Sequence, residues 1–65
     1  MNGQIEHVET YKGYTIEWYN CNGAKAKALM PDGEPVMRNG KRVVATHPSA
    51  RVVRESICKF IDSLI

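Results

Sequence analysis

The last quarter of the chain carries a stripe of apolar side chains that predicts an amphipathic helix over residues 49–64. Its apolar residues recur at steps of three, four or one, so they share one side of a helix with a 3.6-residue period. Pro48 disfavours helical geometry in the residue before it, so Ser49, rather than Thr46, is the expected N-cap. The stripe consists of Ala50, Val53, Ile57, Phe60, Ile61 and Leu64.

The residues before this stripe alternate between apolar and polar side chains, as half-buried strands do. Turn signals that contain glycine or proline divide them. The sequence therefore predicts an α+β fold, a small antiparallel β-meander of three to five strands with one C-terminal amphipathic helix packed on one face. The expected strands cover residues 5–10, 14–20, 24–30, 36–38 and 41–45.

The turn at Asn22-Gly23 has two possible lengths, and the faces of the strands decide between them. A two-residue loop places Lys27 opposite Trp18 and mixes charge into the apolar face. A three-residue loop over residues 21–23, with glycine left-handed, keeps the faces distinct. Its expected pairs are Trp18 with Ala26, Ile16 with Ala28 and Tyr14 with Met30 on the helix side, and Glu17 with Lys27 and Tyr19 with Lys25 on the other side.

Two more hairpins and one turn complete the expected sheet. A three-residue loop over residues 11–13 places Val8 opposite Ile16 and Thr10 beside Tyr14, and it creates a cross-strand row of His7, Glu17 and Lys27. The segment 31–35 is a turn, since its prolines cannot donate to a central ladder. Asn39-Gly40 suits a type I′ turn.

The 65 residues are expected to form one domain, residues 1–65, around one small core. A chain of this size buries only about 60% of the surface that its unfolded form exposes, so self-association stays open as a source of further burial. The expected core consists of Trp18, Ile16, Tyr14, Val8, Val53, Ile57, Phe60, Ile61 and Leu64.

No membrane or secretory segment is expected. The longest apolar run has three residues, as at Val43 to Ala45, far below the ~20 of a membrane helix. The first four residues lack the features of a secretory signal. Without export, Cys21 and Cys58 are expected to be reduced thiols of a cytoplasmic protein. A disulfide between them is not expected, because the cytoplasm keeps thiols reduced.

Catalysis, metal binding and cofactor binding are not expected either. His47 and Ser49 are close in sequence, but no third residue is identifiable that would orient a nucleophile and its base. The two cysteines and two histidines (His7 and His47) show no local spacing of a zinc site. A chain this short would also struggle to enclose a pocket. We therefore expect a non-enzymatic protein without a small-molecule substrate.

The formal net charge of +2 hides an asymmetry along the chain. Residues 38–54 contain five basic residues and no acidic one, whereas residues 1–24 contain three glutamates and one lysine. Like charges lie opposite each other beside the Asn39-Gly40 turn, and an anion such as a nucleic-acid phosphate would relieve this conflict. The alternative is a solvated turn that leaves the edge unpaired. The basic residues at this tip are Arg38, Lys41 and Arg42.

The sheet face away from the helix is the second candidate surface. Tyr19 beside Lys25 and Lys27 combines an aromatic ring with cations, as in surfaces that stack bases. The same face would also serve as a protein interface or dimer face, or remain an ordinary surface with a cation–π contact. The expected interaction face consists of Thr15, Glu17, Tyr19 and Leu29, and the expected nucleic-acid contacts are Arg38, Lys41, Arg42, Lys25, Lys27 and Tyr19.

Two general resemblances accompany this interpretation. A small antiparallel sheet followed by one packed helix is similar in plan to the three-stranded DNA-binding domains of some phage and transposon integrases, with no motif to carry over. The stretch Tyr11 to Ile16, with Pro31-Asp32-Gly33 and Phe60-Ile61-Asp62, resembles small proteins of bacteria and their phages, which implies no particular activity.

The function expected from the sequence is a non-enzymatic interaction module. It is expected to bind a protein partner, or a second copy of itself, through the open sheet face or an edge strand. The alternative is a nucleic-acid-binding domain that uses the basic hairpin tip and the sheet face. The mild net charge favours the first hypothesis.

Overall fold

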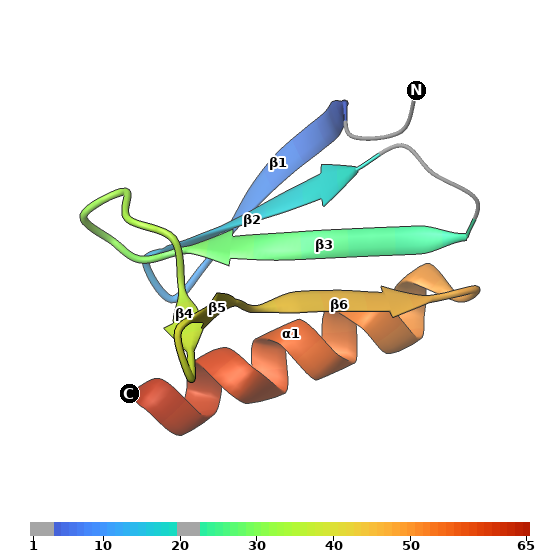
Figure 1. Ribbon diagram of the computed structural model, residues 1–65. Helices are drawn as coiled ribbons and strands as arrows, with labels where there is room; N and C mark the ends of the chain where they lie inside the picture. Colours follow the sequence, from blue (N-terminus) through green and yellow to red (C-terminus); the bar gives the residue numbers. More distant parts are fainter. Residues whose placement is uncertain (1–3, 20–22) are drawn as a thin grey trace.

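A four-stranded antiparallel sheet with one helix against it forms the body of the protein (Figure 1). The computed structural model describes residues 4–19 and 23–65. The sheet order is β1-β2-β3-β6, and β4 pairs only with β5 in a separate hairpin. This arrangement confirms the α+β prediction. The elements are β1 (Ile5–Tyr11), β2 (Tyr14–Tyr19), β3 (Ala24–Leu29), β4 (Met37–Arg38), β5 (Lys41–Arg42), β6 (Val44–His47) and α1 (Ala50–Leu64).

The register of β2 and β3 is the one that side-chain parity predicts. Trp18 pairs with Ala26, and Glu17 pairs with Lys27 on the opposite face. The ladder ends at Leu29, so the expected pair of Tyr14 and Met30 lies beyond it. Gly23 has a φ of +84°, as a left-handed last loop position requires. Residues 20–22 of this loop lie outside the described residues.

The register of β1 and β2 differs by one residue from the prediction. The turn has two residues, Lys12 at φ +51° and Gly13 at φ +87°. Val8 therefore pairs with Glu17 rather than with Ile16, and it is 54% exposed, so its place in the predicted core was wrong.

The shift also removes the predicted row of His7, Glu17 and Lys27. His7 pairs with Trp18 instead, and the two rings stack with their centroids 5.7 Å apart. A register irregularity between Ile5 and His7 follows. Because α1 packs mainly on β3 and β6, polar side chains of β1 can occupy the helix side of the sheet without burial.

The predicted strand over residues 41–45 is divided in two. Lys41–Arg42 belongs to the β4–β5 hairpin, whose Asn39 and Gly40 have φ of +55° and +76°, as the predicted type I′ turn requires. Beyond Val43 the chain enters the large sheet as β6 and pairs with β3. The Val43 amide, between the two strands, donates a hydrogen bond to the Val36 carbonyl at 3.0 Å. This bond connects the break in the strand to the residue just before β4.

The loop over residues 31–35 is a turn, as predicted. The Gly33 amide donates to the Met30 carbonyl at 2.8 Å, and the Glu34 amide donates to an Asp32 carboxylate oxygen at 3.0 Å. The Val36 amide then donates to the Ala28 carbonyl, which brings the chain back across the end of β3.

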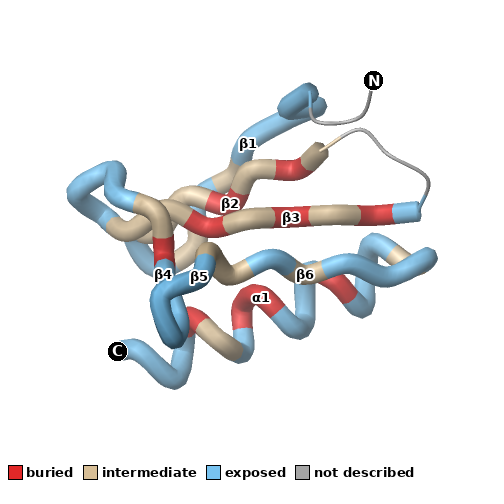
Figure 2. Tube along the Cα trace, in the orientation of Figure 1, coloured by how far each residue is buried: buried red, intermediate tan, exposed pale blue. Residues whose placement is uncertain are grey.

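The core lies between the helix and the central strands, where Figure 2 shows buried segments on β2, β3 and α1. The three alanines of β3 let the helix approach the sheet closely. Leu64 is 46% exposed, so the predicted core extended too far along α1, whereas Tyr14 and Phe60 are half-buried and pack against the core. The buried residues are Ile16, Trp18, Ala24, Ala26, Ala28, Val36, Val53, Ile57, Cys58 and Ile61, of which Ala24, Ala26, Ala28, Val36 and Cys58 were absent from the predicted core.

Ser49 is the N-cap of α1, as predicted, but its hydroxyl makes no capping hydrogen bond. Its backbone amide instead donates to Nδ1 of His47 at 3.0 Å. On α1, neither Arg51 nor Lys59 forms an ion pair with Glu55 among the described residues. Within the same residues, no helix is both long and apolar enough to cross a bilayer.

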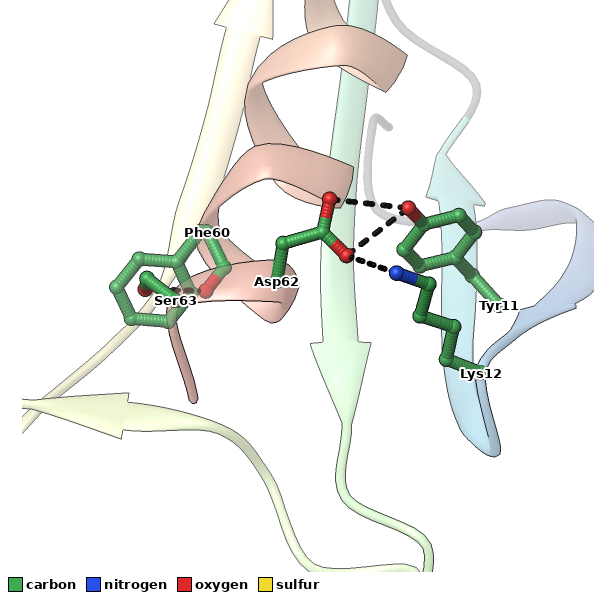
Figure 3. A network of polar contacts seen from close by, with 5 residues as sticks. All are labelled: Tyr11, Lys12, Phe60, Asp62 and Ser63. Carbon is green, nitrogen blue, oxygen red and sulfur yellow. Dashed lines mark hydrogen bonds and ion pairs between the residues drawn. The ribbon is translucent and has the colours of Figure 1, made fainter. Parts of the chain in front are cut away.

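Two polar contacts connect the first hairpin to the helix. The Arg54 guanidinium donates twice to Oε2 of Glu9, at 3.0 and 3.1 Å, while Trp18 Nε1 donates to Oε1 at 2.8 Å. Near the end of α1, Asp62 accepts from the Lys12 ammonium at 2.8 Å and from the Tyr11 hydroxyl at 3.0 Å (Figure 3). We call these two groups of contacts the polar clasps: one joins Glu9 to Arg54, and the other joins Asp62 to Lys12 and Tyr11.

The polar clasps make the stability of the fold depend on pH. Hydrogen bonds from Arg54 lower the pKa of Glu9, and hydrogen bonds from Lys12 lower the pKa of Asp62. A carboxyl group whose pKa is lower in the folded than in the unfolded chain stabilises the fold above its unfolded pKa, and this contribution is lost as the pH falls. We expect the free energy of unfolding to decrease between about pH 5 and pH 3.

Urea unfolding at a series of pH values measures this dependence. Glu9→Gln should flatten the curve, since it removes one titrating clasp, whereas Glu55→Gln changes an exposed helix carboxylate outside the ion pairs and should leave the slope unchanged. Equal slopes for wild type and Glu9→Gln would contradict the clasp.

Candidate functional site

The sheet face opposite the helix has a polar centre in which Glu17 is paired with Arg42 and Tyr19. Here Glu17 of β2 accepts from Nη2 of Arg42 at 2.9 Å and from the Tyr19 hydroxyl at 3.3 Å. The Glu17 side chain is only 15% exposed and that of Arg42 is 31% exposed. Nε of Arg42 is buried and has no hydrogen-bond partner among the described residues. The centre of this face is therefore ordered before any partner binds.

Tyr19 carries the aromatic surface of the same face. The ammonium groups of Lys27 and Lys25 lie 4.8 and 5.8 Å from the centroid of its ring, as the predicted cation–π contact requires. Burial, followed by the nearby Glu17 carboxylate, raises the pKa of the Tyr19 hydroxyl. The Tyr19 ring thus has two positive charges beside it.

Exposed aliphatic side chains surround this centre. Val8 on β1 is 54% exposed and Val44 on β6 is 42% exposed, and both belong to the cross-strand row of Glu17 and Lys27. Ile5, opposite Tyr19 in the register, is 47% exposed. We call the eight residues that follow the open face: Val8, Thr15, Glu17, Tyr19, Lys25, Lys27, Leu29 and Val44.

The residues predicted to contact nucleic acid lie in two places. Lys25, Lys27 and Tyr19 lie on the open face, and Arg42 reaches it from β5. Arg38 instead lies 5.8 Å from the Phe60 ring, at the far end of the helix. Its cross-strand partner, Lys41, belongs to the same hairpin. The structure therefore brings four of the six residues together on one face. The other two, Arg38 and Lys41, form a cross-strand pair in the β4–β5 hairpin.

A groove of about 500 Å³ lies where the β4–β5 hairpin, the start of β6 and helix α1 meet. Basic side chains line one part of it and apolar side chains line the other. No sequence signal pointed to this groove, because it depends on the division of the predicted 41–45 strand. Its lining includes Arg38, Lys41, Arg42, Val44, Ile57 and Phe60.

Other reactive groups of the described residues are dispersed. Nδ1 of His47 accepts from the backbone amide of Ser49, so its contact to that residue does not involve the hydroxyl. Cys58 is a buried free thiol whose pKa is raised by burial. Across residues 4–19 and 23–65, no three His, Cys, Asp or Glu side chains gather as a metal-binding group. The other cysteine, Cys21, lies outside the described residues.

Comparison of the chain with protein-family models, with curated proteins and with solved structures found no match. Its geometry and chemistry are therefore the basis of the functional argument.

Proposed function

We propose that this protein is a non-enzymatic interaction module that binds an acidic protein partner through the open face. The observation that carries the proposal is the combination on one face of exposed aliphatic side chains, an ordered tyrosine and an excess of positive charge. Tyrosine and arginine are enriched in protein interfaces, and exposed apolar groups at the rim add buried area on binding. The pairing of Glu17 with Arg42 lowers the ordering cost of association.

Charge favours an acidic partner over a second copy of the chain. The open face carries Lys25, Lys27 and Arg42 against one carboxylate, that of Glu17. A two-fold dimer through this face would place the same basic patch against itself. A partner with carboxylates opposite the lysines would gain attraction where a second copy meets repulsion.

Nucleic-acid binding is the second candidate, since Tyr19 and the lysines could contact bases and phosphates. Two observations favour protein over nucleic acid. Lys27 lies close to the ring that a base would have to stack on, and a carboxylate lies at the centre of the face.

Matched charge reversals test the proposal in extracts of the source cells. The immobilised protein should retain an acidic protein, and nuclease treatment should not release it. The Lys25→Glu variant should no longer retain this protein, whereas the Lys59→Glu variant should still do so. Lys25 is on the open face, whereas Lys59 is an exposed residue of α1, so both variants change the net charge equally.

Three results, besides a failure to retain any protein, would contradict the proposal. The first is equal retention by the two variants. The second is loss of the bound material on nuclease treatment, which would favour the nucleic-acid alternative. The third is light scattering that gives the mass of two chains for wild type and of one chain for Lys25→Glu, which would place a second copy on the face.

We propose the cytoplasm as the compartment of this interaction. The buried Cys58 is a free thiol in the structure, and cytoplasmic proteins keep their thiols reduced. Thiol labelling after rapid lysis under denaturing conditions would measure its state in cells.

A further inference from the structure

The groove beside the β4–β5 hairpin is next to an unpaired strand. β6 is the outer strand in the order β1-β2-β3-β6, and no strand of the described residues pairs with its other side. An edge strand presents backbone N–H and C=O groups that can pair with an added strand. The groove begins at Val44, where β6 starts, and extends to Ile57 and Phe60 of the helix.

The chemistry of the groove specifies what an added strand would carry. Arg38, Lys41 and Arg42 line it, and no acidic residue is among the described residues that do so. Beside these cations, Ile57 and Phe60 of the helix add apolar groups to its lining. Successive side chains of a strand point to opposite faces, so alternating acidic and aliphatic residues would place one kind near the helix and the other near the hairpin.

We infer that this groove binds an extended acidic peptide segment, which adds to β6 as a further antiparallel or parallel strand. Main-chain hydrogen bonds to the edge would supply affinity, and the basic and apolar parts of the groove would supply specificity. Carboxylates opposite arginine form the stronger class of hydrogen bond. The segment is short, because β6 spans only Val44–His47 and Pro48 follows it.

A second copy of the chain fits this edge less well. Antiparallel pairing of two β6 strands about a two-fold axis would bring the hairpin of each copy to the end of β6 in the other. There the basic hairpin residues Arg38 and Lys41 would meet Arg51, which is exposed in the first turn of α1. Like charges in contact oppose such a dimer.

This inference can be tested independently of the proposed function. Val44 and Arg42 contribute to both sites, but each site also has a basic residue of its own. Lys41 belongs to the groove and Lys25 to the open face. A variant of one therefore reports on one site only, and either proposal can fail while the other holds.

Backbone amide NMR of the whole protein tests the inference with defined peptides. The main probe is a short peptide of alternating Glu and Val. A second peptide replaces each Glu by Lys, and a third is the acidic peptide with alternate backbone nitrogens methylated, so that it keeps its side chains and loses donors. Lys41→Glu is the test variant, and Lys59→Glu is the control of equal charge.

The acidic peptide should shift the amide resonances of Val44–His47, and Lys41→Glu should raise its dissociation constant about tenfold, while Lys59→Glu should leave it within about twofold. The Lys peptide and the methylated peptide should bind at least about tenfold more weakly. Equal binding of the methylated peptide would overturn strand addition. Shifts confined to the open face, no shifts, or shifts produced only by a DNA duplex would overturn the site.

Discussion

Ile61→Ala should cost the fold about 2–5 kcal/mol, because it removes a fully buried side chain and leaves a cavity between helix and sheet. Ile61 is 0% exposed in the last part of α1. A domain of this length has a total stability of roughly 3–10 kcal/mol, so the loss is about half of it. Urea unfolding followed by Trp18 fluorescence measures the change, since the indole is in the core.

Leu64→Ala is the matched control for that prediction. Leu64 lies one turn further along the same helix and belongs to the same predicted apolar stripe, but it is 46% exposed. Its truncation should cost less than about 1 kcal/mol, since much of the side chain is in water in both states. Equal losses for the two variants would show that the end of α1 packs differently from the structure.

Gly23→Ala should destabilise the protein by about 2–5 kcal/mol, the sum of backbone strain and steric overlap. Gly23 has a φ of +84°, a conformation that L side chains rarely adopt. A Cβ built there would lie 3.1 Å from the His47 carbonyl oxygen and 3.2 Å from Cα of Pro48. Both are backbone atoms at the end of β6, so relief would require the edge strand to move away from β3.

Gly33→Ala separates the two causes. Gly33 has a similar φ of +92°, but nothing lies within 4 Å of the position that a Cβ would take there. It should therefore cost only the backbone term of about 1–2 kcal/mol. The difference between the two variants in thermal or urea unfolding measures the close approach at Gly23. An equal loss would mean that β6 is not held against that turn.

The sequence was sufficient for the second hairpin and insufficient for the first. In β3 alanines alternate with lysines, so a register shifted by one residue would place the charges on the helix side, and the observed register keeps them on the outer face. β1 has no such constraint, because α1 packs mainly on β3 and β6 and leaves β1 exposed or half-buried throughout. Glu9 can then lie on the helix side of the sheet, where it accepts a hydrogen bond from Arg54. Because β1 has no apolar face, the alternation of its side chains does not determine its register.

The candidate site was predictable in part, because the alternation of side chains along β2 and β3 determines which residues share a face. The register of β2 and β3 places Tyr19, Lys25 and Glu17 on one face, as expected from the sequence. The fold of Arg42 back to Glu17 is a contact across 25 positions of the chain, and no local pattern encodes it. The three apolar residues at 43–45 do not alternate, so the break that creates β6 and its groove had no signal either.

The off-centre position of the helix gives the sheet two unequal edges. α1 supports β6, and no strand of the described residues pairs with its outer side, whereas the polar clasps attach β1 to the helix. Exposed ion pairs weaken with salt and acid, and a strand without a buried face can separate below the free energy of global unfolding. Detachment of β1 would uncover the hydrogen-bonding groups of β2. One side of the molecule is thus always available to a new strand, and the other becomes available only under conditions that loosen its charges.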